Sequence, residues 1–375
     1  MQQEYFGIGS VDRLEQILAQ EKPTKIFLVT GKKSYLSSGA QAKLEPILSP
    51  YQLTHFSDFA QNPDIEDVRR GIDLYQREGC DLVIAVGGGS VIDLAKAVNI
   101  LAVQTGLSEQ YLLKEKEIES RGKSLVAIPT TSGSGSEATH FAVIYVKSKK
   151  YSLAHQSLLP NYVLLDPSLT LTLPKEITAV TGMDAFGQAI EAYWSVNSTE
   201  ESRRYSEEAI RLILPNLKLA VNQPTVQARV AMMKAANLAG KAINIAQTTV
   251  SHALSYSLTS DFGIPHGHAA SLTLGQAFRY NNAVTNEDCN DRRGVDYVKR
   301  MMADLILILG CRTATEARNR IKELMSSIGL ETDLSQLGVK ERDFNGIVNS
   351  VNLERLKNNP RSFPSLDALK ELFFS

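Results

Sequence analysis

The sequence predicts an α/β plus all-α fold, with a doubly wound parallel sheet in the N-terminal part and helices in the C-terminal part. Over residues 1–175, short apolar runs alternate with stretches of helical spacing, which is typical of a parallel sheet covered by helices. Beyond that point strand signals nearly vanish. A chain of 375 residues that is 43% hydrophobic is also long enough to form two cores. We therefore expect one domain of residues 1–175 and a second of residues 176–375.

The expected strands of the first domain are apolar runs that end in turn residues, as buried strands do. A segment of helical spacing, residues 64–80, lies between the first two strands and opens with acidic residues, which suit the positive end of a helix dipole. Residues 140–154 alternate apolar and polar side chains and predict a hairpin beside the sheet. The strands are residues 25–31, 81–89, 124–131 and 162–167.

The second domain is expected to be helical because apolar residues recur there with a helical period. The segments that show this most clearly are residues 177–194, 201–217, 225–243 and 298–309.

The composition excludes several classes of function. The formal net charge is -1 and no basic run concentrates charge, so nucleic acid is not an expected partner. The apolar stretches are shorter than the ~18 residues that a membrane span needs. The N-terminus lacks the features of a secretory signal, and the 3 cysteines are far apart, which suits a reducing compartment. We expect a cytoplasmic protein that binds neither nucleic acid nor membrane.

Glycines at positions 87–89 connect a predicted strand to a predicted helix. A backbone without side chains can approach a phosphate, and the helix start at Ser90 offers free N–H groups at a positive dipole end. The spacing is neither a Walker loop nor the Rossmann fingerprint, whose third glycine would fall at Ile92. From spacing alone the turn is either a phosphate-binding loop or a plain strand-to-helix connection.

A second loop, residues 129–139, also follows a predicted strand and is rich in small and hydroxyl side chains. Such a loop can wrap a ribose or pyrophosphate, although a flexible polar loop has the same composition. Open α/β sheets bind ligands at the carboxyl ends of their strands. Two loops of this kind at strand ends of one sheet therefore favour a ligand site.

Metal-ligand residue types gather in the second domain. Asp184 and Gln188 are four residues apart in a predicted helix and share one face. His252 and His266 flank a Gly/Pro helix break, which can aim both imidazoles at one point. A lone histidine is more often a packed core residue than a ligand. Two histidines in a domain that also carries Asp184 favour a metal site.

Four segments together resemble the iron-containing (group III) alcohol dehydrogenases, in the order and spacing of that family. They are residues 85–97, 128–139, 182–193 and 265–270. The resemblance runs from the first strand to about Asn281. It implies a dehydroquinate-synthase-like fold, with an N-terminal nucleotide domain and a C-terminal helical domain that binds metal and substrate. It also implies hydride transfer between NAD(P)H and a small aldehyde or primary alcohol.

The resemblance assigns the cofactor-binding residues of the first domain. The glycine turn and the start of the helix after it are expected to hold the cofactor pyrophosphate. The second loop is expected to line the cofactor site, and a hairpin lysine to contact the nicotinamide ribose. The residues so assigned are Gly87, Gly88, Gly89, Ser90, Asp93, Thr130, Thr131, Ser134 and Lys150.

Cofactor preference is expected to depend on the residues after the first strand. NAD-preferring members of the family often place an aspartate there, which binds the ribose 2′-hydroxyl. Here that position is Gly31, followed by Lys32 and Lys33. A missing carboxylate and added positive charge suit a 2′-phosphate, so we predict a preference for NADPH over NADH.

The resemblance implies a metal site of one aspartate and three histidines. Asp184, His252 and His266 match three of these positions, and Gln188 stands at the fourth. A glutamine carbonyl oxygen ligates a divalent ion more weakly than an imidazole does. We expect a looser site for Fe(II), with Zn(II) or Mn(II) as alternatives. In the alternative interpretation, Gln188 makes an ordinary hydrogen bond and the site stays empty.

Proton transfer has two candidate residues. Many family members carry a further histidine four residues after the first histidine ligand, and this histidine is thought to relay a proton. The corresponding residue here is Tyr256, so Tyr256 and His268 are the candidates.

Residues 188–202 and 238–257 are similar to the branch of the family that acts as phosphonoacetaldehyde reductases, which make 2-hydroxyethylphosphonate. Lys241 would suit an anionic substrate, with Thr248 or Thr249 as neutral donors. A lysine that extends along the surface to reach solvent is the competing interpretation of Lys241.

Other functions fit the same fold. A general small-alcohol dehydrogenase needs the same residues and differs only in the substrate pocket. A sugar-phosphate cyclase-like lyase should carry more basic residues for its phosphate. The retained aspartate, histidines and glycine turn argue against a non-catalytic descendant. The family also leads us to expect a homodimer.

Overall fold

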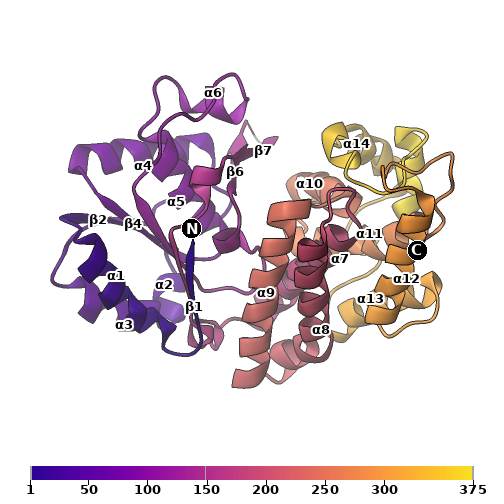
Figure 1. Cartoon of the computed structure of the whole chain (residues 1–375), viewed down its shortest axis with the longest axis horizontal. Coiled ribbons are helices and arrows are strands. Elements are labelled where there is room, and N and C mark those ends of the chain that lie inside the picture. The colour runs from indigo at the N-terminus through magenta and orange to yellow at the C-terminus, as the bar shows by residue number, and fades with distance from the viewer. Residues whose placement is uncertain (1, 148, 374–375) are drawn as a thin grey trace. The chain divides into compact units, whose positions relative to one another are not determined.

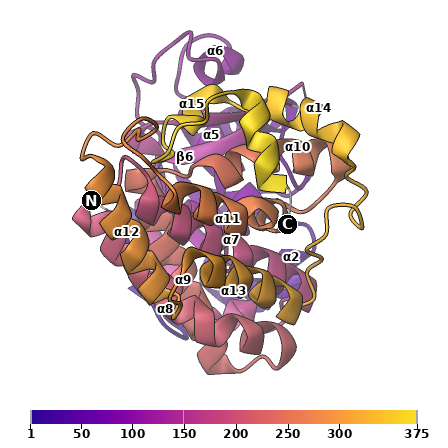
Figure 2. The same cartoon turned by 90° about the vertical axis from the view of Figure 1, so that its right-hand side faces the viewer.

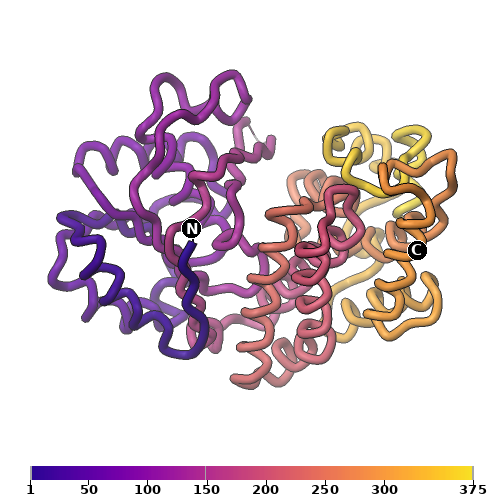
Figure 3. The backbone as a smooth tube through the Cα atoms, in the orientation of Figure 1, coloured from indigo at the N-terminus to yellow at the C-terminus, as the bar shows by residue number. Residues whose placement is uncertain are grey.

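The computed structural model describes residues 2–147 and 149–373 of the chain. The protein divides into two compact units of consecutive residues, Met1–Leu173 and Pro174–Ser375. In the backbone trace of Figure 3, the first unit runs from indigo to magenta and the second continues to yellow. No helix in the described part of the chain is long and apolar enough to cross a bilayer.

The first unit contains a six-stranded sheet in which every pairing is parallel (Figure 1). Its strand order is β1-β8-β5-β4-β2-β3. All four strands predicted from apolar runs are present, although each ends before the turn residues that follow it. The strands are β1 (Gln3–Phe6), β2 (Lys25–Thr30), β3 (Gln52–Phe56), β4 (Leu82–Gly87), β5 (Ser124–Pro129) and β8 (Tyr162–Leu165).

Helices pack on both faces of this sheet. One face is covered by α4 (Ile65–Glu78) and α5 (Gly89–Leu101). The other face is covered by α1 (Arg13–Glu21) and α3 (Ala40–Leu48). This arrangement confirms the predicted doubly wound sheet. Two short helices complete the unit, α2 (Ser34–Ser37) and α6 (Ser108–Leu112).

The boundaries of α4 follow from its sequence. The Asp64 side chain accepts a hydrogen bond from the backbone N–H of Asp67, and the Asp67 side chain accepts one from the N–H of Asp64, which is a capping box. Gly79 ends the helix in a left-handed conformation with φ 64°. The predicted hairpin is also confirmed, as β6 (Phe141–Val146) pairs with β7 (Lys149–Ala154) in a separate antiparallel sheet.

The sequence analysis missed β1 and β3, which form the two edges of the sheet. An edge strand faces solvent along much of its length, and the exposure of β1 is high at nearly every position. Neither strand therefore needs the continuous apolar run that marks the buried central strands.

The second unit is helical, as predicted, and its core is continuous across the helices. In Figure 2, α7 and α11 lie at the centre of this unit, with α12 and α13 towards the viewer. The longer helices are α7 (Lys175–Trp194), α8 (Glu200–Asn222), α9 (Val226–Ala246), α10 (Val250–Phe262), α11 (His266–Asn282), α12 (Val295–Ile308) and α13 (Ala314–Ser327). Shorter ones follow at α14 (Phe344–Asn349), α15 (Leu353–Leu356) and η6 (Leu366–Phe373).

Helix α7 is buried on nearly all sides, because α8, α9 and α11 all pack against it. Its sequence is accordingly apolar around the whole helix. Against that background, the buried polar residues Asp184, Gln188 and Glu191 stand out. They lie at spacings of four and three residues, so they share one face of the helix.

Candidate functional site

The glycine turn of the first unit connects β4 to α5. A Cβ on Gly87 would lie 2.4 Å from the Val91 side chain, and one on Gly89 would lie 2.5 Å from Ser134 Oγ. These positions therefore require glycine because of close packing, since neither has a positive φ. Gly88 to Ser90 are only half-buried, so the start of α5 can be reached by a ligand.

The second predicted loop packs directly against the glycine turn. The Thr130 N–H donates to the Gly87 carbonyl at 3.0 Å, and Ser134 approaches Gly89. The buried hydroxyls of Thr130 and Ser132 find no hydrogen-bond partner among the described residues. Buried polar groups are rarely left in this state without a ligand or water. The two loops thus form one cradle whose chemistry fits a dinucleotide.

Asp93 was predicted to bind the cofactor, but its carboxylate is directed into the protein. It accepts hydrogen bonds from the Ser136 hydroxyl and from the Val143 N–H, the latter at 3.0 Å. A buried carboxylate would also repel a pyrophosphate. Asp93 is therefore placed to hold the second loop and the hairpin against α5. Lys150, on β7, lies close enough to lower the pKa of Asp93, although burial raises that pKa overall.

Lys96 is a residue of this cradle that the sequence analysis did not single out. Its side chain is 1% exposed, and its ammonium donates to the backbone carbonyls of Ser136, Thr139 and Phe141. Because these carbonyls belong to the second loop and to β6, Lys96 fixes that loop over α5. Burial lowers the pKa of Lys96 from 10.5 to about 8.

Replacing Lys96 by methionine is expected to destabilise the protein by roughly 3 kcal/mol, because buried carbonyls lose a charged donor. The difference should also depend on pH. Between about pH 8 and 10.5 the unfolded chain keeps a proton that folded Lys96 has released, so this residue's contribution to stability rises with pH. The difference in the free energy of unfolding between the wild type and Lys96→Met, measured with urea, should therefore increase from pH 8 to 9.5. A Lys149→Met variant, changed at an exposed lysine of β7, is the control, and a difference that stays constant would contradict the assignment.

The basic residues expected to favour NADPH lie after β2. Lys32 is exposed and forms an ion pair with Asp58, which is also exposed. The charge of Lys32 is therefore shared with a carboxylate that the sequence analysis did not consider. Gly31 lies at the end of β2, next to the end of β4 in the sheet order.

In the second unit, Asp184, His252 and His266 come together. One ligand atom from each lies within 4.8 Å of the others, and His252 Nε2 is 3.4 Å from Asp184 Oδ1. Ligand atoms bound to one ion at about 2.0–2.2 Å are themselves roughly 3–4 Å apart. The cluster therefore fits one divalent ion with only small adjustments. Asp184 comes from the middle of α7, and the histidines from the first turns of α10 and α11.

The turn between α10 and α11 aims the two histidines. Gly263 adopts the left-handed conformation with φ 69° and ends α10, and its N–H donates to the Thr259 carbonyl at 3.1 Å. The N–H of Ile264 donates to the Leu258 carbonyl at 3.2 Å. Pro265 then starts α11, with His266 as its first residue. The helix break predicted from the sequence is thus confirmed, and it turns the chain back within a few residues.

Glu191 orients His252 and was missed by the sequence analysis. Its carboxylate is fully buried and accepts a hydrogen bond from the N–H at Nδ1 of His252. It also accepts hydrogen bonds from the N–H of Ser251 at 2.7 Å and from the Thr249 hydroxyl at 2.7 Å. A carboxylate on the far nitrogen of a histidine fixes the tautomer and leaves Nε2 for an ion.

The pKa values agree with this pairing. Burial lowers the pKa of His252, but the carboxylates of Glu191 and Asp184 outweigh burial and raise it to about 9. Burial raises the pKa of Glu191, yet His252 and Thr249 hold it below the usual value. Thr249 Oγ1 also accepts a hydrogen bond from the indole of Trp194 at 2.8 Å. Thr249 therefore belongs to this buried network and not to the substrate donors proposed from the sequence.

Ser255 orients His266 in a similar way. The Ser255 hydroxyl donates a hydrogen bond to the His252 carbonyl at 2.8 Å. Its oxygen is therefore left to accept a hydrogen bond from the N–H at Nδ1 of His266 at 3.2 Å. That assignment leaves Nε2 of His266 as the ligand nitrogen. Both imidazoles are thus fixed before an ion binds.

Gln188 lies one turn after Asp184 on the same face of α7 and is buried. Close packing holds that face against the other helices. A Cβ on Gly267 would lie 2.2 Å from the Val180 carbonyl and 2.7 Å from Asp184 Cβ. Only glycine therefore lets the first turn of α11 approach α7 at the position of Asp184.

The other predicted residues have different surroundings. The Tyr256 ring stacks on His266, with centroids 5.9 Å apart and planes at 19°, and burial raises the pKa of Tyr256. His268 is not one of the three clustered residues, and its Nε2 hydrogen-bonds the Glu331 carbonyl at 2.6 Å. Lys241 is a half-buried residue of α9. Thr248 accepts a hydrogen bond from Arg355 at 3.0 Å.

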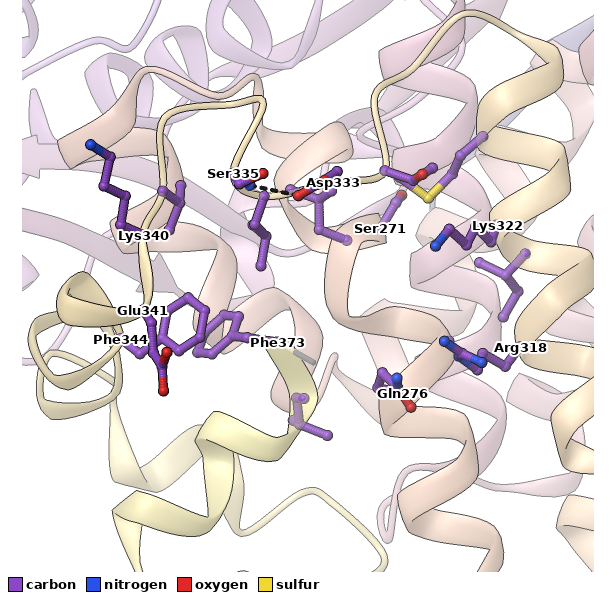
Figure 4. A pocket seen from close by; sticks show the side chains of 18 residues that line it. Ser271, Gln276, Arg318, Lys322, Asp333, Ser335, Lys340, Glu341, Phe344 and Phe373 are labelled. Carbon is purple, nitrogen blue, oxygen red and sulfur yellow. Dashed lines mark hydrogen bonds between the residues drawn. The ribbon is translucent and has the colours of Figure 1, made fainter. Parts of the chain in front are cut away.

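A cavity of about 320 Å³ lies elsewhere in the helical unit, and Figure 4 shows it from close by. It opens between α11, α13 and the C-terminal segments, with the stacked rings of Phe344 and Phe373 on one side. Charges of both signs surround it, including Arg318 and Glu341. None of the candidate metal ligands lines this cavity.

A unit with a doubly wound sheet and a glycine cradle, combined in one chain with a helical unit that carries a preoriented cluster of one carboxylate and two imidazoles, is typical of metal-dependent nicotinamide oxidoreductases. Comparison with known families agrees. Residues 2–167 match the model of the iron-containing alcohol dehydrogenases, and residues 178–373 match the C-terminal model of the Fe-containing alcohol dehydrogenase family. The chain therefore belongs to the iron-containing alcohol dehydrogenase family and is an NAD(P)-dependent oxidoreductase.

Several relatives show the range of the family. The chain is 36% identical to a phosphonoacetaldehyde reductase of Streptomyces viridochromogenes over 75% of its length and 72% of that protein. It is 35% identical to a 1,3-propanediol dehydrogenase of Klebsiella pneumoniae, over 91% and 88%. Among solved structures, the sulfoacetaldehyde reductase of Bifidobacterium kashiwanohense in complex with NAD+ aligns with a TM-score of 0.87 and 30% identity, covering 99% of this chain and 96% of that one.

Proposed function

We propose that the protein is a metal-dependent aldehyde reductase whose preferred substrate is phosphonoacetaldehyde, reduced to 2-hydroxyethylphosphonate. The observation that carries the reductase chemistry is the buried cluster of Asp184, His252 and His266, whose imidazoles are fixed through Nδ1. The relatives that act on phosphonoacetaldehyde and sulfoacetaldehyde support the substrate, because both compounds are short aldehydes with an anionic group.

The residues of each unit have separate tasks in this proposal. Asp184, Gln188, His252 and His266 would hold a divalent ion, Fe(II) by preference, and the chemistry that this ion would supply is Lewis-acid polarisation of the aldehyde oxygen. The glycine cradle of the first unit binds the dinucleotide pyrophosphate at the start of α5. Tyr256 is the better of the two proton-relay candidates, because its ring lies against His266, whereas His268 is bonded to Glu331.

A panel of aldehydes tests the substrate. The metal-loaded protein should oxidise NAD(P)H fastest, by kcat/KM, with phosphonoacetaldehyde, measured as absorbance loss at ~340 nm. Equal or higher values with propionaldehyde or 3-hydroxypropionaldehyde would favour a general small-alcohol dehydrogenase, to which the 1,3-propanediol dehydrogenase relative points. Chelation followed by re-addition of Fe(II), Zn(II) or Mn(II) identifies the metal that restores the rate.

We also propose a preference for NADPH, with Lys32 near the 2′-phosphate. Lys32→Ala should lower the ratio of kcat/KM for NADPH over NADH about fivefold, as expected for one exposed ionic contact. Asp58→Asn should raise the same ratio, because it releases Lys32 from its ion pair. A wild-type protein that uses NADH as well as or better than NADPH would contradict this preference.

We propose a cytoplasmic homodimer in which residues 1–175 bind the dinucleotide and residues 176–375 bind metal and substrate. Light scattering of the purified protein measures the oligomeric state, and a monomeric mass would contradict the dimer.

A further inference from the structure

Resting on the proposed function, we propose that Arg355 binds the anionic group of the substrate and makes the enzyme specific for short aldehydes that carry a phosphonate or sulfonate. Arg355 lies in α15, within a C-terminal region for which the sequence analysis proposed no chemistry. The sequence analysis had considered Lys241 for this task.

The position of Arg355 relative to the ion ligands is the first argument. Its guanidinium carbon lies 5.3 Å from the centroid of the Tyr256 ring, and that ring stacks on His266. His266, Tyr256 and Arg355 therefore form a chain of neighbours that starts at the ion cluster. A short aldehyde whose oxygen is held at the ion would extend its anionic end by only a few bonds, which suits a receptor at this range.

The charge of Arg355 is the second argument. Among the described residues of the same unit, three other arginines lie over tyrosine rings, namely Arg203, Arg293 and Arg361. Arg293 and Arg361 each form an ion pair with an aspartate, and Arg203 donates to the Tyr297 hydroxyl. Arg355 forms no ion pair with any carboxylate of the described residues. Within the described part of the chain, the guanidinium makes one hydrogen bond, to the Thr248 hydroxyl. The guanidinium is half-buried and keeps most of its donors for a ligand.

The chemistry of the group fits an oxyanion. A planar guanidinium presents parallel N–H donors that match two oxygens of a phosphonate or sulfonate, and it stays charged at all physiological pH values. Its contact with the Tyr256 ring holds the plane of the guanidinium without using its donors. A lysine ammonium such as that of Lys241 lacks these paired, parallel N–H donors.

The segment that carries Arg355 is firmly attached beside the ion cluster. The Asn358 side-chain amide donates to the Thr248 carbonyl at 3.2 Å and to Gln247 Oε1 at 3.1 Å. Gln247 itself has φ 61° and ψ 165°, a sparsely populated conformation for a residue with a side chain. Such conformations persist where the surroundings hold them, often beside functional sites. Arg355 is thus fixed in place before a substrate arrives.

The test compares charged and neutral aldehydes of similar length with the metal-loaded enzyme. For phosphonoacetaldehyde, sulfoacetaldehyde and propionaldehyde, kcat/KM is measured in the wild type and in Arg355→Met, Arg355→Lys, Lys357→Met and Lys241→Met. Arg355→Met should lower the ratio of charged to neutral kcat/KM by about 10- to 100-fold, mainly through KM. Arg355→Lys should lose less, because it keeps the charge. The two charged substrates separate a phosphonate from a sulfonate preference.

Lys357→Met is the matched control. It removes the same charge two residues further along the chain, from an exposed side chain that pairs with Glu354. The ratio in this variant should stay within about twofold of the wild type, because exposed charges are screened. An unchanged ratio in Arg355→Met would overturn the proposal. If Arg355→Met fails to fold, Arg355→Lys takes its place. The ratio of charged to neutral kcat/KM should then fall in Arg355→Lys, and the Ki of methylphosphonate should rise relative to the wild type; if both stay unchanged, the proposal is overturned.

Failure of this inference can be told apart from failure of the proposed function. A wild type that reduces no aldehyde, or only propionaldehyde, contradicts the proposed function or its substrate and overturns the role of Arg355 as well. A wild type that prefers the charged aldehydes, but loses that preference in Lys241→Met and not in Arg355→Met, supports the proposed substrate and overturns the Arg355 assignment.

Discussion

Replacing Asp184 by alanine is expected to lower kcat/KM by roughly 10³-fold or more, because it removes the charged ligand of the proposed ion. Asp184 is the one carboxylate of the cluster, and His252 Nε2 lies 3.4 Å from its Oδ1. The purified variant should also contain far less than one equivalent of metal. Metal analysis and steady-state kinetics on the same preparation measure both effects.

The control for this variant is Asp304→Ala, which removes an exposed carboxylate from α12 in the same unit. Gln188 supplies a graded comparison. Gln188→His should tighten metal binding, because imidazole is the stronger ligand, and Gln188→Ala should weaken it. Full activity of the wild type after exhaustive chelation would count against a catalytic metal, and an unchanged metal affinity in both Gln188 variants would remove Gln188 from the ligand set.

The sequence predicted most of the features that the backbone determines. Four buried strands, the hairpin, the helical second unit and the break before His266 all follow from apolar periodicity and turn residues, and the structure contains each of them. The meeting of Asp184 with His252 and His266 was predicted from residue type and the helix break. Apolar periodicity provided no signal for β1 and β3, because strands at the edges of the sheet do not require apolar runs.

The residues that support the site were harder to predict, because their partners lie far away in the sequence. Glu191 accepts a hydrogen bond from the start of α10, Lys96 donates to the loop before β6, and Arg355 donates to the turn between α9 and α10. Only Glu191 left a usable signal, since it continues the polar face of Asp184 and Gln188 on an otherwise apolar helix. Asp93 and His268 were given ligand and proton roles from the sequence, and the structure shows a protein hydrogen-bond partner for each that the sequence did not indicate.

Glu191→Ala is expected to destabilise the protein by roughly 3–5 kcal/mol, because it leaves a buried imidazole and several N–H groups without their acceptor. The carboxylate of Glu191 accepts from the backbone of Ser251 and Thr249 at the start of α10, so its loss also removes the cap of that helix. Thermal unfolding of the metal-free protein measures this effect. Ser255→Ala, which removes the acceptor of His266, is expected to have a smaller effect because Ser255 is a neutral partner.

Glu191→Gln separates the role in metal binding from the role in folding. The glutamine side chain keeps the shape and one acceptor oxygen, but it no longer provides the charge that holds the Nδ1 proton of His252. Zn(II) affinity, titrated by calorimetry, should therefore fall about 10- to 100-fold, while the melting temperature falls less than in Glu191→Ala. If Glu191 served only to cap α10, the two variants would lose stability and the metal affinity of the folded protein would stay at the wild-type value. Capping α10 needs only an acceptor oxygen, whereas orienting His252 also needs the negative charge. A large loss of Zn(II) affinity together with a small fall in melting temperature in Glu191→Gln would therefore show that the charge of Glu191 acts on the metal site.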